Sequence, residues 1–263
     1  MSVKIKKYLL SFWIYHFIIL TLFAQGELSE QSRIFYRNER SIGALLNSNG
    51  YGVSGRYAKR INARNKTIYE VDLIGIKHPK EVKITNYYSS NKSYVFGKLN
   101  SFFDLRAGYG RQREMFRKID RGGISIRRFY SAGPALGILK PVYYEIIQTN
   151  TADPNDKFLK QEKFNSSTHQ GNIWGKASFF KGMDELSLVP GAFGRFGFSF
   201  EYSRHDITLH ALETGITLDI FIKKIPIMAT EKNNFIFFSL FVSYRFGKVV
   251  DASGIIDEKD LMN

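Results

Sequence analysis

The last long apolar segment, from Asn234 to Lys248, most constrains what this chain can fold into. Every second residue in it is apolar, which gives one unbroken file formed by Ile236, Phe238, Leu240, Val242, Tyr244 and Phe246. The alternate file turns polar towards its end, at Ser243 and Arg245. Because side chains of a strand alternate between its two faces, the pattern predicts a strand with one wholly apolar face. A strand of this length that ends in aromatic residues is typical of a transmembrane β-barrel.

The N-terminus has the three zones of an export signal. Three lysines within the first seven residues precede a nearly continuous apolar run from Tyr8 to Phe23, and small residues follow at Ala24 and Gly26. This order predicts a cleaved signal peptide over residues 1–26. A retained membrane anchor is the alternative, because the apolar run is long for a signal. No later apolar run is long enough for a membrane helix, so we expect any further membrane contact to be made by strands.

Composition narrows the compartment and the partners. The chain contains no cysteine, which excludes a lipoprotein anchor, disulfides and thiol-ligated metals and suits an exported protein. The formal net charge is +14, but the basic residues are scattered rather than gathered in a block, so we do not expect nucleic acid as a partner. We expect outer-membrane lipids and the phosphates of lipopolysaccharide instead. Aromatic residues at 15% favour a lipid-facing surface with aromatic girdles.

Alternation and turn signals predict one domain, an antiparallel β-barrel over residues 27–248, followed by a short acidic periplasmic tail over residues 249–263. We expect about ten strands, with eight or twelve as alternatives, because alternation is a weak signal in each segment. The ten segments lie near residues 40–47, 51–58, 69–73, 94–99, 103–110, 124–130, 138–147, 196–202, 216–222 and 234–248. The segment Gly133 to Gly137 is interpreted as a break between two of these strands.

The expected loops differ in length at the two ends of the barrel. With both chain ends in the periplasm, the long segments at Lys80–Ser93 and at residues 148–190 fall outside the cell. The short turns at Asn62–Lys66, Asn100–Ser101 and Arg204–Asp206 fall inside, which is the asymmetry expected of such barrels. Aromatic residues in the long extracellular loop predict that part of it folds over the rim or into the lumen; they are Trp174, Phe179 and Phe180.

Charged residues occupy the face opposite the apolar file in several strands, and we expect them to face the lumen. They are Arg56, Glu70, Asp72, Asp104, Arg106, Arg127, Glu201 and Asp219. In a narrow barrel, opposite charges would pair and fill the lumen, whereas a selective pore lined by them is the alternative. A soluble sandwich or lipocalin-like barrel shows the same alternation with the apolar face inward. The signal peptide, the aromatic excess and the final strand favour the membrane barrel.

No catalytic, cofactor or metal site is predicted. His205 lies in a periplasmic turn and His210 near a strand start, away from any partner set. A loop-built site at the outer rim that uses His78 or His169 stays open as an alternative, since nothing fixes a nucleophile, base and orienting group together. Glycines at residues 50–52 and 108–110 sit in or beside strands without a following helix, so neither pair forms a phosphate loop.

Two segments resemble a largely uncharacterised group of outer-membrane β-barrel proteins of the Bacteroidota: Gly122–Tyr144 and Gly175–Glu185. The resemblance implies export, insertion by the barrel-assembly machinery and an outer-membrane location. It implies no activity and no site residue. We therefore expect a non-enzymatic barrel with a structural or interaction role, with an outer-membrane or periplasmic protein as a possible partner. A narrow porin or transport accessory is the alternative, and a rim hydrolase is the second alternative.

Overall fold

The computed structural model describes residues 38–85, 92–120, 122–150, 156–168, 171–203 and 207–250. The predicted signal peptide, His169, His205 and the tail beyond Val250 lie outside these ranges. Thirteen β-strands make up the secondary structure of the described residues. No helix in them is long and apolar enough to span a membrane.

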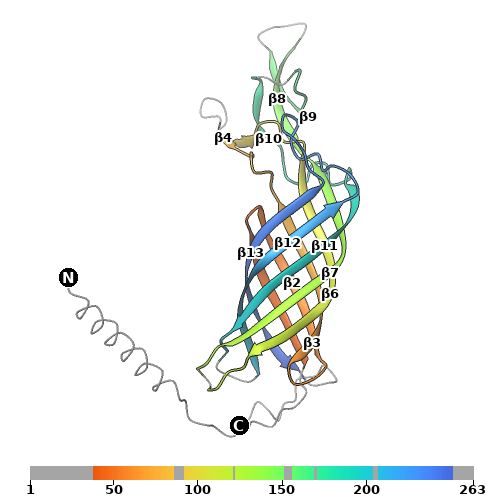
Figure 1. The fold of residues 1–263 in the computed structure, drawn as a ribbon. Coiled ribbons are helices and arrows are strands. Elements are labelled where there is room, and N and C mark those ends of the chain that lie inside the picture. The colour runs from red at the N-terminus through yellow and green to blue at the C-terminus, as the bar shows by residue number, and fades with distance from the viewer. Residues whose placement is uncertain are drawn as a thin grey trace, which may run out of the picture.

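Eight strands form a closed antiparallel barrel, in the order β1-β2-β3-β6-β7-β11-β12-β13 and back to β1 (Figure 1). Their bounds are β1 Asn38–Asn47, β2 Gly50–Arg60, β3 Asn65–Ile76, β6 Asn100–Phe116, β7 Ser125–Pro141, β11 Ser187–Glu201, β12 Thr208–Phe221 and β13 Ile236–Val250. The barrel closes where β1 pairs with β13, in a register that places Asn38 opposite Val250 and Asn47 opposite Phe241.

Alternation along the strands sorts side chains between the wall's outer face and the lumen. The apolar file of β13 points outward, and its members keep 43–59% of their surface exposed. The intervening residues Ser239, Phe241, Ser243 and Arg245 point inward and are buried. The apolar face therefore lies outside, which is the reverse of a soluble barrel.

The expectation of ten strands is wrong, and eight, the lower alternative, is correct. The segment near Tyr94 pairs outside the barrel, as part of β5. The two segments on either side of Gly133–Gly137 form one strand, β7, which runs through Pro134. A Cβ at Gly133 would lie 2.0 Å from the Ala107 carbonyl oxygen, so this glycine permits close strand pairing and does not end the strand.

The connections differ sharply between the two ends. At the terminal end, which holds Asn38 and Val250, the connections span residues 61–64, 117–124 and 202–207. At the loop end they span residues 48–49, 77–99, 142–186 and 222–235. One expectation is corrected by the strand count: Asn100–Ser101 is not a turn at the periplasmic end, because these residues begin β6 at the loop end.

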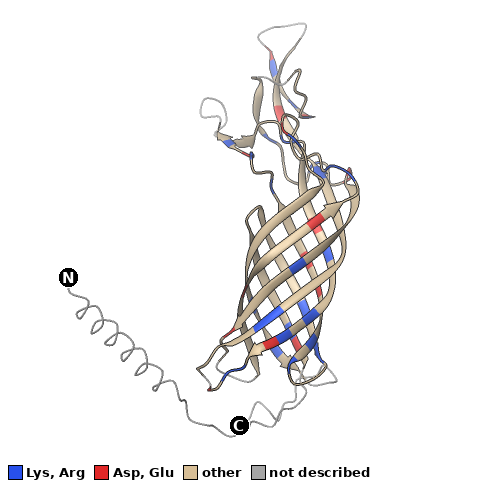
Figure 2. Ribbon diagram, viewed as in Figure 1, with Lys and Arg blue, Asp and Glu red and all other residues tan. Residues whose placement is uncertain are grey.

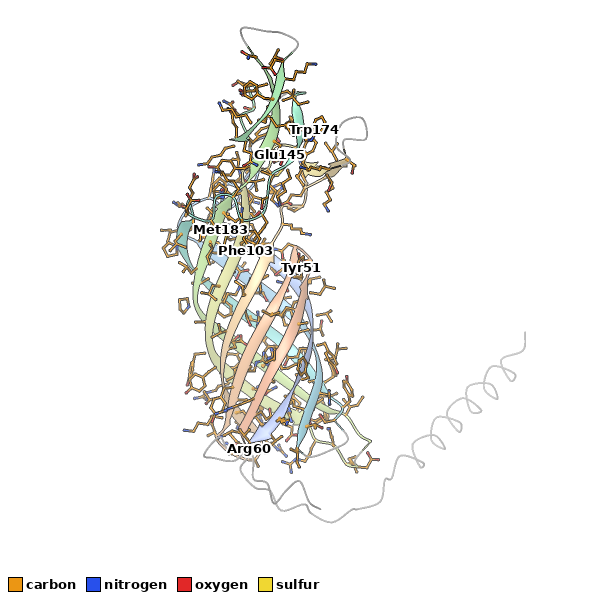
Figure 3. The ribbon with its side chains drawn as sticks, turned by 180° about the vertical axis from the view of Figure 1, so that it is seen from behind. Tyr51, Arg60, Phe103, Glu145, Trp174 and Met183 are labelled. Atoms are coloured by element: carbon orange, nitrogen blue, oxygen red, sulfur yellow. The ribbon has the colours of Figure 1, made fainter. Side chains whose placement is uncertain are left out.

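Two small sheets project beyond the loop end (Figure 1). One is a two-stranded sheet of β4 (Lys83–Thr85) and β5 (Ser93–Val95), and the other is a three-stranded sheet of β10 (Ile173–Lys176), β8 (Tyr143–Thr149) and β9 (Lys157–Lys163). Glu145 and Trp174 lie within this projection, whereas Tyr51 and Phe103 mark the rim and Arg60 the opposite end (Figure 3). The described residues of the long 142–186 connection thus form most of a separate sheet outside the barrel.

Candidate functional site

An apolar plug fills the lumen at the loop end. Inward-facing Phe102, Phe221 and Phe237 meet with ring centroids 5.3–6.0 Å apart. The connection between β12 and β13 covers them, because its residues Ile225 and Ile227 are fully buried in the same cluster. These contacts close the mouth of the barrel with side chains from both the wall and a loop.

Three groups of paired charges lie along the lumen below this plug. The first is built on Arg106, whose Nε donates to Asp104 Oδ2 and whose Nη2 donates to Asp219 Oδ2, both at 2.7 Å. All three side chains are fully buried. The Arg106 guanidinium also lies 5.6 Å from the ring of Phe193, which contributes a cation–π contact.

The second group crosses the middle of the lumen. Arg56 donates to Glu70 at 2.9 Å and to Glu213 at 2.6 Å, and so joins carboxylates of two distant strands. Arg195 bonds Asp72 at 2.6 Å and also reaches Glu70 at 3.3 Å. Arg245, the remaining member of this group, donates to Glu213 at 3.2 Å. The group therefore ties β2, β3, β11, β12 and β13 together across the barrel.

The third group lies at the terminal end. Glu39 pairs with Lys66 and Arg127, and Glu201 pairs with Arg127 and Lys118. Figure 2 shows that charged residues gather in the part of the barrel strands nearer the terminal end. A cavity of about 10 Å³ lined by Lys66 and Arg127, among others, lies beside this group. That volume is about the size of one water molecule.

All eight residues of the predicted lumen network are buried inside the barrel, and the structure brings each into an ion pair with another inward-facing residue. Six further members were not in the predicted set: Glu39, Lys66, Lys118, Arg195, Glu213 and Arg245. The alternation of β11 and β13 places Arg195 and Arg245 on the inward face, so the same pattern could have found those two. Lys118 lies in a connection, and no alternation marks it.

The second candidate site is the projecting three-stranded sheet of β8, β9 and β10, here called the outer sheet. This sheet has a hydrophobic core of its own. Buried Tyr144, Ile146, Phe164 and Ile173 pack together, and aromatic residues of the 77–99 connection pack against them. The Tyr144 hydroxyl donates to the carbonyls of Val95 at 2.6 Å and Lys98 at 2.9 Å. Burial raises the pKa of the Tyr144 phenol. Two connections that are distant in sequence therefore form one ordered unit.

The outer sheet is fixed to the barrel rim by contacts on its lower side. Glu185, just before β11, accepts a hydrogen bond from the Tyr143 hydroxyl at 2.7 Å and forms an ion pair with Lys163 of β9. The hydrogen bond from Lys163 holds the pKa of the Glu185 carboxyl below its usual value. Phe179 packs against Phe103 of the rim, with ring centroids 6.4 Å apart. The expectation that part of the long loop covers the rim is met by Phe179, whereas Trp174 lies in the sheet.

Two of the histidines considered for a catalytic site, His78 and His210, lie within the described residues. The His78 ring lies in the 77–99 connection, where Nδ1 accepts from the Lys80 N–H at 3.2 Å and Nε2 lies 3.4 Å from the Lys232 carbonyl oxygen. Both ring nitrogens thus contact backbone groups of two connections. His210 faces outward from β12 beside the Tyr244 hydroxyl, at 3.2 Å. Within the described residues, no three His, Asp or Glu side chains are placed to hold a metal ion.

Comparison with known proteins gives matches only among solved structures. No family model and no curated protein matches the chain. Ail, the attachment invasion locus protein of Yersinia pestis, solved with the heparin analogue sucrose octasulfate, is 9% identical, with a TM-score of 0.42 over 82% of this chain and 99% of that chain. Neisserial surface protein A (NspA) is 10% identical, with a TM-score of 0.33 over 82% of this chain and 96% of that chain. Nothing about activity follows from a likeness at this level.

Proposed function

We propose that this chain is a small outer-membrane β-barrel protein with a structural or interaction role at the cell surface. The observation that carries the proposal is the inverted distribution of side chains. Keeping the exposed area of the apolar side chains of the outer wall in water would cost about 25 cal/mol of free energy per Å², relative to an apolar surrounding. The charged side chains lie inside the barrel, where they pair with one another. Such a wall suits acyl chains around it, and the barrel leaves no strand edge to the lipid.

The two ends support an orientation. Barrels of this kind place short turns in the periplasm and long loops outside, so we assign the terminal end to the periplasm and the outer sheet to the cell surface. Insertion would depend on the barrel-assembly machinery. The lipids around the wall, with lipopolysaccharide at the loop end, are the proposed environment. The apolar plug and the three charged groups favour an interaction role over transport through the lumen.

Single-cysteine labelling tests the location and the orientation. Because the chain contains no cysteine, each variant carries one thiol. Lys160→Cys places it on the exposed strand β9, and Ile119→Cys places it in the connection at the terminal end, where Ile119 is 71% exposed. A membrane-impermeant maleimide should label Lys160→Cys on intact cells and Ile119→Cys only after the outer membrane is permeabilised. The reverse pattern, or a processed protein that stays monomeric in water without detergent, would contradict the proposal.

The interaction role has a separate test. A crosslinker attached to Lys160→Cys should give a product of fixed mass in native membranes, because an ordered sheet presents one constant surface to a partner. The same reagent on Leu46→Cys, an exposed position on the lipid-facing wall, is the control. A fixed product from β9 alone supports an interaction at the outer sheet. Equal yields from both positions, or none from β9, would instead favour a purely structural role.

A further inference from the structure

The outer wall carries an open apolar hollow near the terminal end, with a volume of about 1600 Å³. Small residues form its floor, at Gly55, Ala107 and Ala132. Registers of the strands place Gly55 opposite Ile42 on one side and Val71 on the other, so a gap lies between two larger side chains. A Cβ built on Gly55 would meet only the Val71 carbonyl oxygen, at 4.0 Å. The hollow is therefore an apolar recess in the apolar outer wall of the barrel.

Two cations and a row of aromatic rings border the hollow towards the terminal end. Lys248, Arg40, Tyr57, Tyr69 and Tyr109 occupy successive paired positions on β13, β1, β2, β3 and β6. The Arg40 guanidinium lies 5.8 Å from the ring of Tyr57, and the rings of Tyr69 and Tyr109 lie 5.4 Å apart. Tyrosines at this level form the girdle that marks a membrane interface.

The charges outside the barrel differ from those inside it. Arg40 and Lys248 have no carboxylate partner among the described residues, and the same holds for the outward-facing Arg113 and Arg128 at this end. The five buried arginines of the lumen, Arg56, Arg106, Arg127, Arg195 and Arg245, are by contrast all paired with carboxylates. Unpaired cations beside an apolar recess are complementary to a molecule that has an anionic head and long acyl chains.

We infer that this hollow binds an anionic phospholipid of the periplasmic leaflet. The phosphate of the lipid would contact Arg40 and Lys248, and one of its acyl chains would lie along the floor of the hollow at Gly55 and Ala107. The tyrosines of the border would sit at the level of the glycerol backbone. This inference rests on the proposed membrane location and orientation, and it adds a lipid class and a site to them.

The test uses the processed protein folded into nanodiscs of phosphatidylcholine that contain a minor share of phosphatidylglycerol. Native mass spectrometry of the released protein then counts the phosphatidylglycerol that stays bound. Each interfacial cation contributes about a fivefold preference for anionic lipid, so the double variant Arg40→Gln, Lys248→Gln should lose roughly 25-fold. Raised salt should reduce the wild-type preference, since exposed charges are screened.

Two further variants make the result specific. Arg113→Gln with Arg128→Gln removes the same charge at the same end but outside the hollow, and should retain most of the preference. Gly55→Leu fills the recess without a change of charge, and should also release the lipid. Equal losses in the two charge variants, full retention by Gly55→Leu, or a second copy of the chain crosslinked across the hollow would overturn the site. Failure to insert into any bilayer would instead contradict the proposed function, whereas insertion without lipid preference contradicts only this inference.

Discussion

Arg106 shows at the scale of a residue how the lumen depends on pairing. Its guanidinium holds the carboxylates of Asp104 and Asp219, and no part of the three side chains reaches solvent. Arg106→Met should destabilise the barrel by about 3–5 kcal/mol, because it leaves two buried carboxylates without their cation. Urea unfolding in detergent micelles, followed by circular dichroism, measures this loss.

The control for that prediction removes the whole charged group together. Arg106→Met combined with Asp104→Asn and Asp219→Asn leaves no unpaired charge, and should recover most of the lost stability. Arg113→Gln on the outer wall changes one charge without touching a pair and should leave the unfolding midpoint close to that of the wild type. If the triple variant is no more stable than Arg106→Met, packing around Arg106 rather than pairing accounts for the loss.

Sequence alternation determines which residues face the lumen, but it does not determine their partners. Arg56 and Glu70 could be assigned to the inward face because both sit opposite apolar files in their strands. That Arg56 also reaches Glu213, 157 positions along the chain, follows from closure of the barrel. Closure depends on strand count and register, which a period of two does not encode. The members of the site were therefore largely predictable, and its connections were not.

The outer sheet depends on a buried hydrogen-bond donor, Tyr144. Its hydroxyl donates to two carbonyls of the neighbouring connection from a buried position. Tyr144→Phe should loosen the sheet by about 1–3 kcal/mol, because it removes the donor from buried carbonyls. Hydrogen exchange along β8 and β10 measures the effect, and exchange along the barrel strand β12 should not change.

The same tyrosine predicts an alkaline transition of the outer sheet. Burial raises the folded-state pKa of Tyr144 above its unfolded value of about 10. The stabilising contribution of the neutral phenol is thus fully present below that value and is lost as the pH rises through it towards the folded pKa. The difference in exchange rate between wild type and Tyr144→Phe should shrink at high pH. A difference that stays constant from neutral to alkaline pH would show that the phenol does not titrate with the sheet.

Strand β7 accounts for one of the two strands by which the sequence overestimates the barrel. Gly133, Pro134 and Gly137 together form a turn signal, and that signal ordinarily ends a strand. In the barrel the two glycines are there for different reasons. Gly133 allows close approach to Ala107, and a Cβ at Gly137 would meet the rings of Phe102 and Phe221 at 2.8 and 3.0 Å. Local sequence could not distinguish these packing roles from a break, because the contacts come from strands far along the chain.

The outer sheet could not be predicted from the sequence because it forms only when the whole barrel has folded. Its core joins Tyr144 and Ile173 of one long connection to Tyr94 and Phe96 of another. From the sequence, Tyr94 and Phe96 fall in one expected barrel strand and Tyr144 in another, whereas Ile173 falls in the long loop, so no local pattern joins them. Only after the barrel brings β3, β6 and β7 side by side do these segments meet at one end. Order at the surface is thus a consequence of closure below it.

The lumen of the whole barrel is closed by two kinds of obstruction, and conductance can test both. In planar bilayers the wild type should give no stable conductance steps, since the apolar plug and the three charged groups each obstruct the lumen. Replacing residues 222–235 by a short turn removes Ile225 and Ile227 from the mouth, yet the charged groups stay in place below. This variant should therefore remain closed as well. Stable steps from the wild type would contradict a filled lumen and favour a narrow pore. Steps from the shortened variant alone would mean that the connection is the seal and that the paired charges below it leave a path for ions.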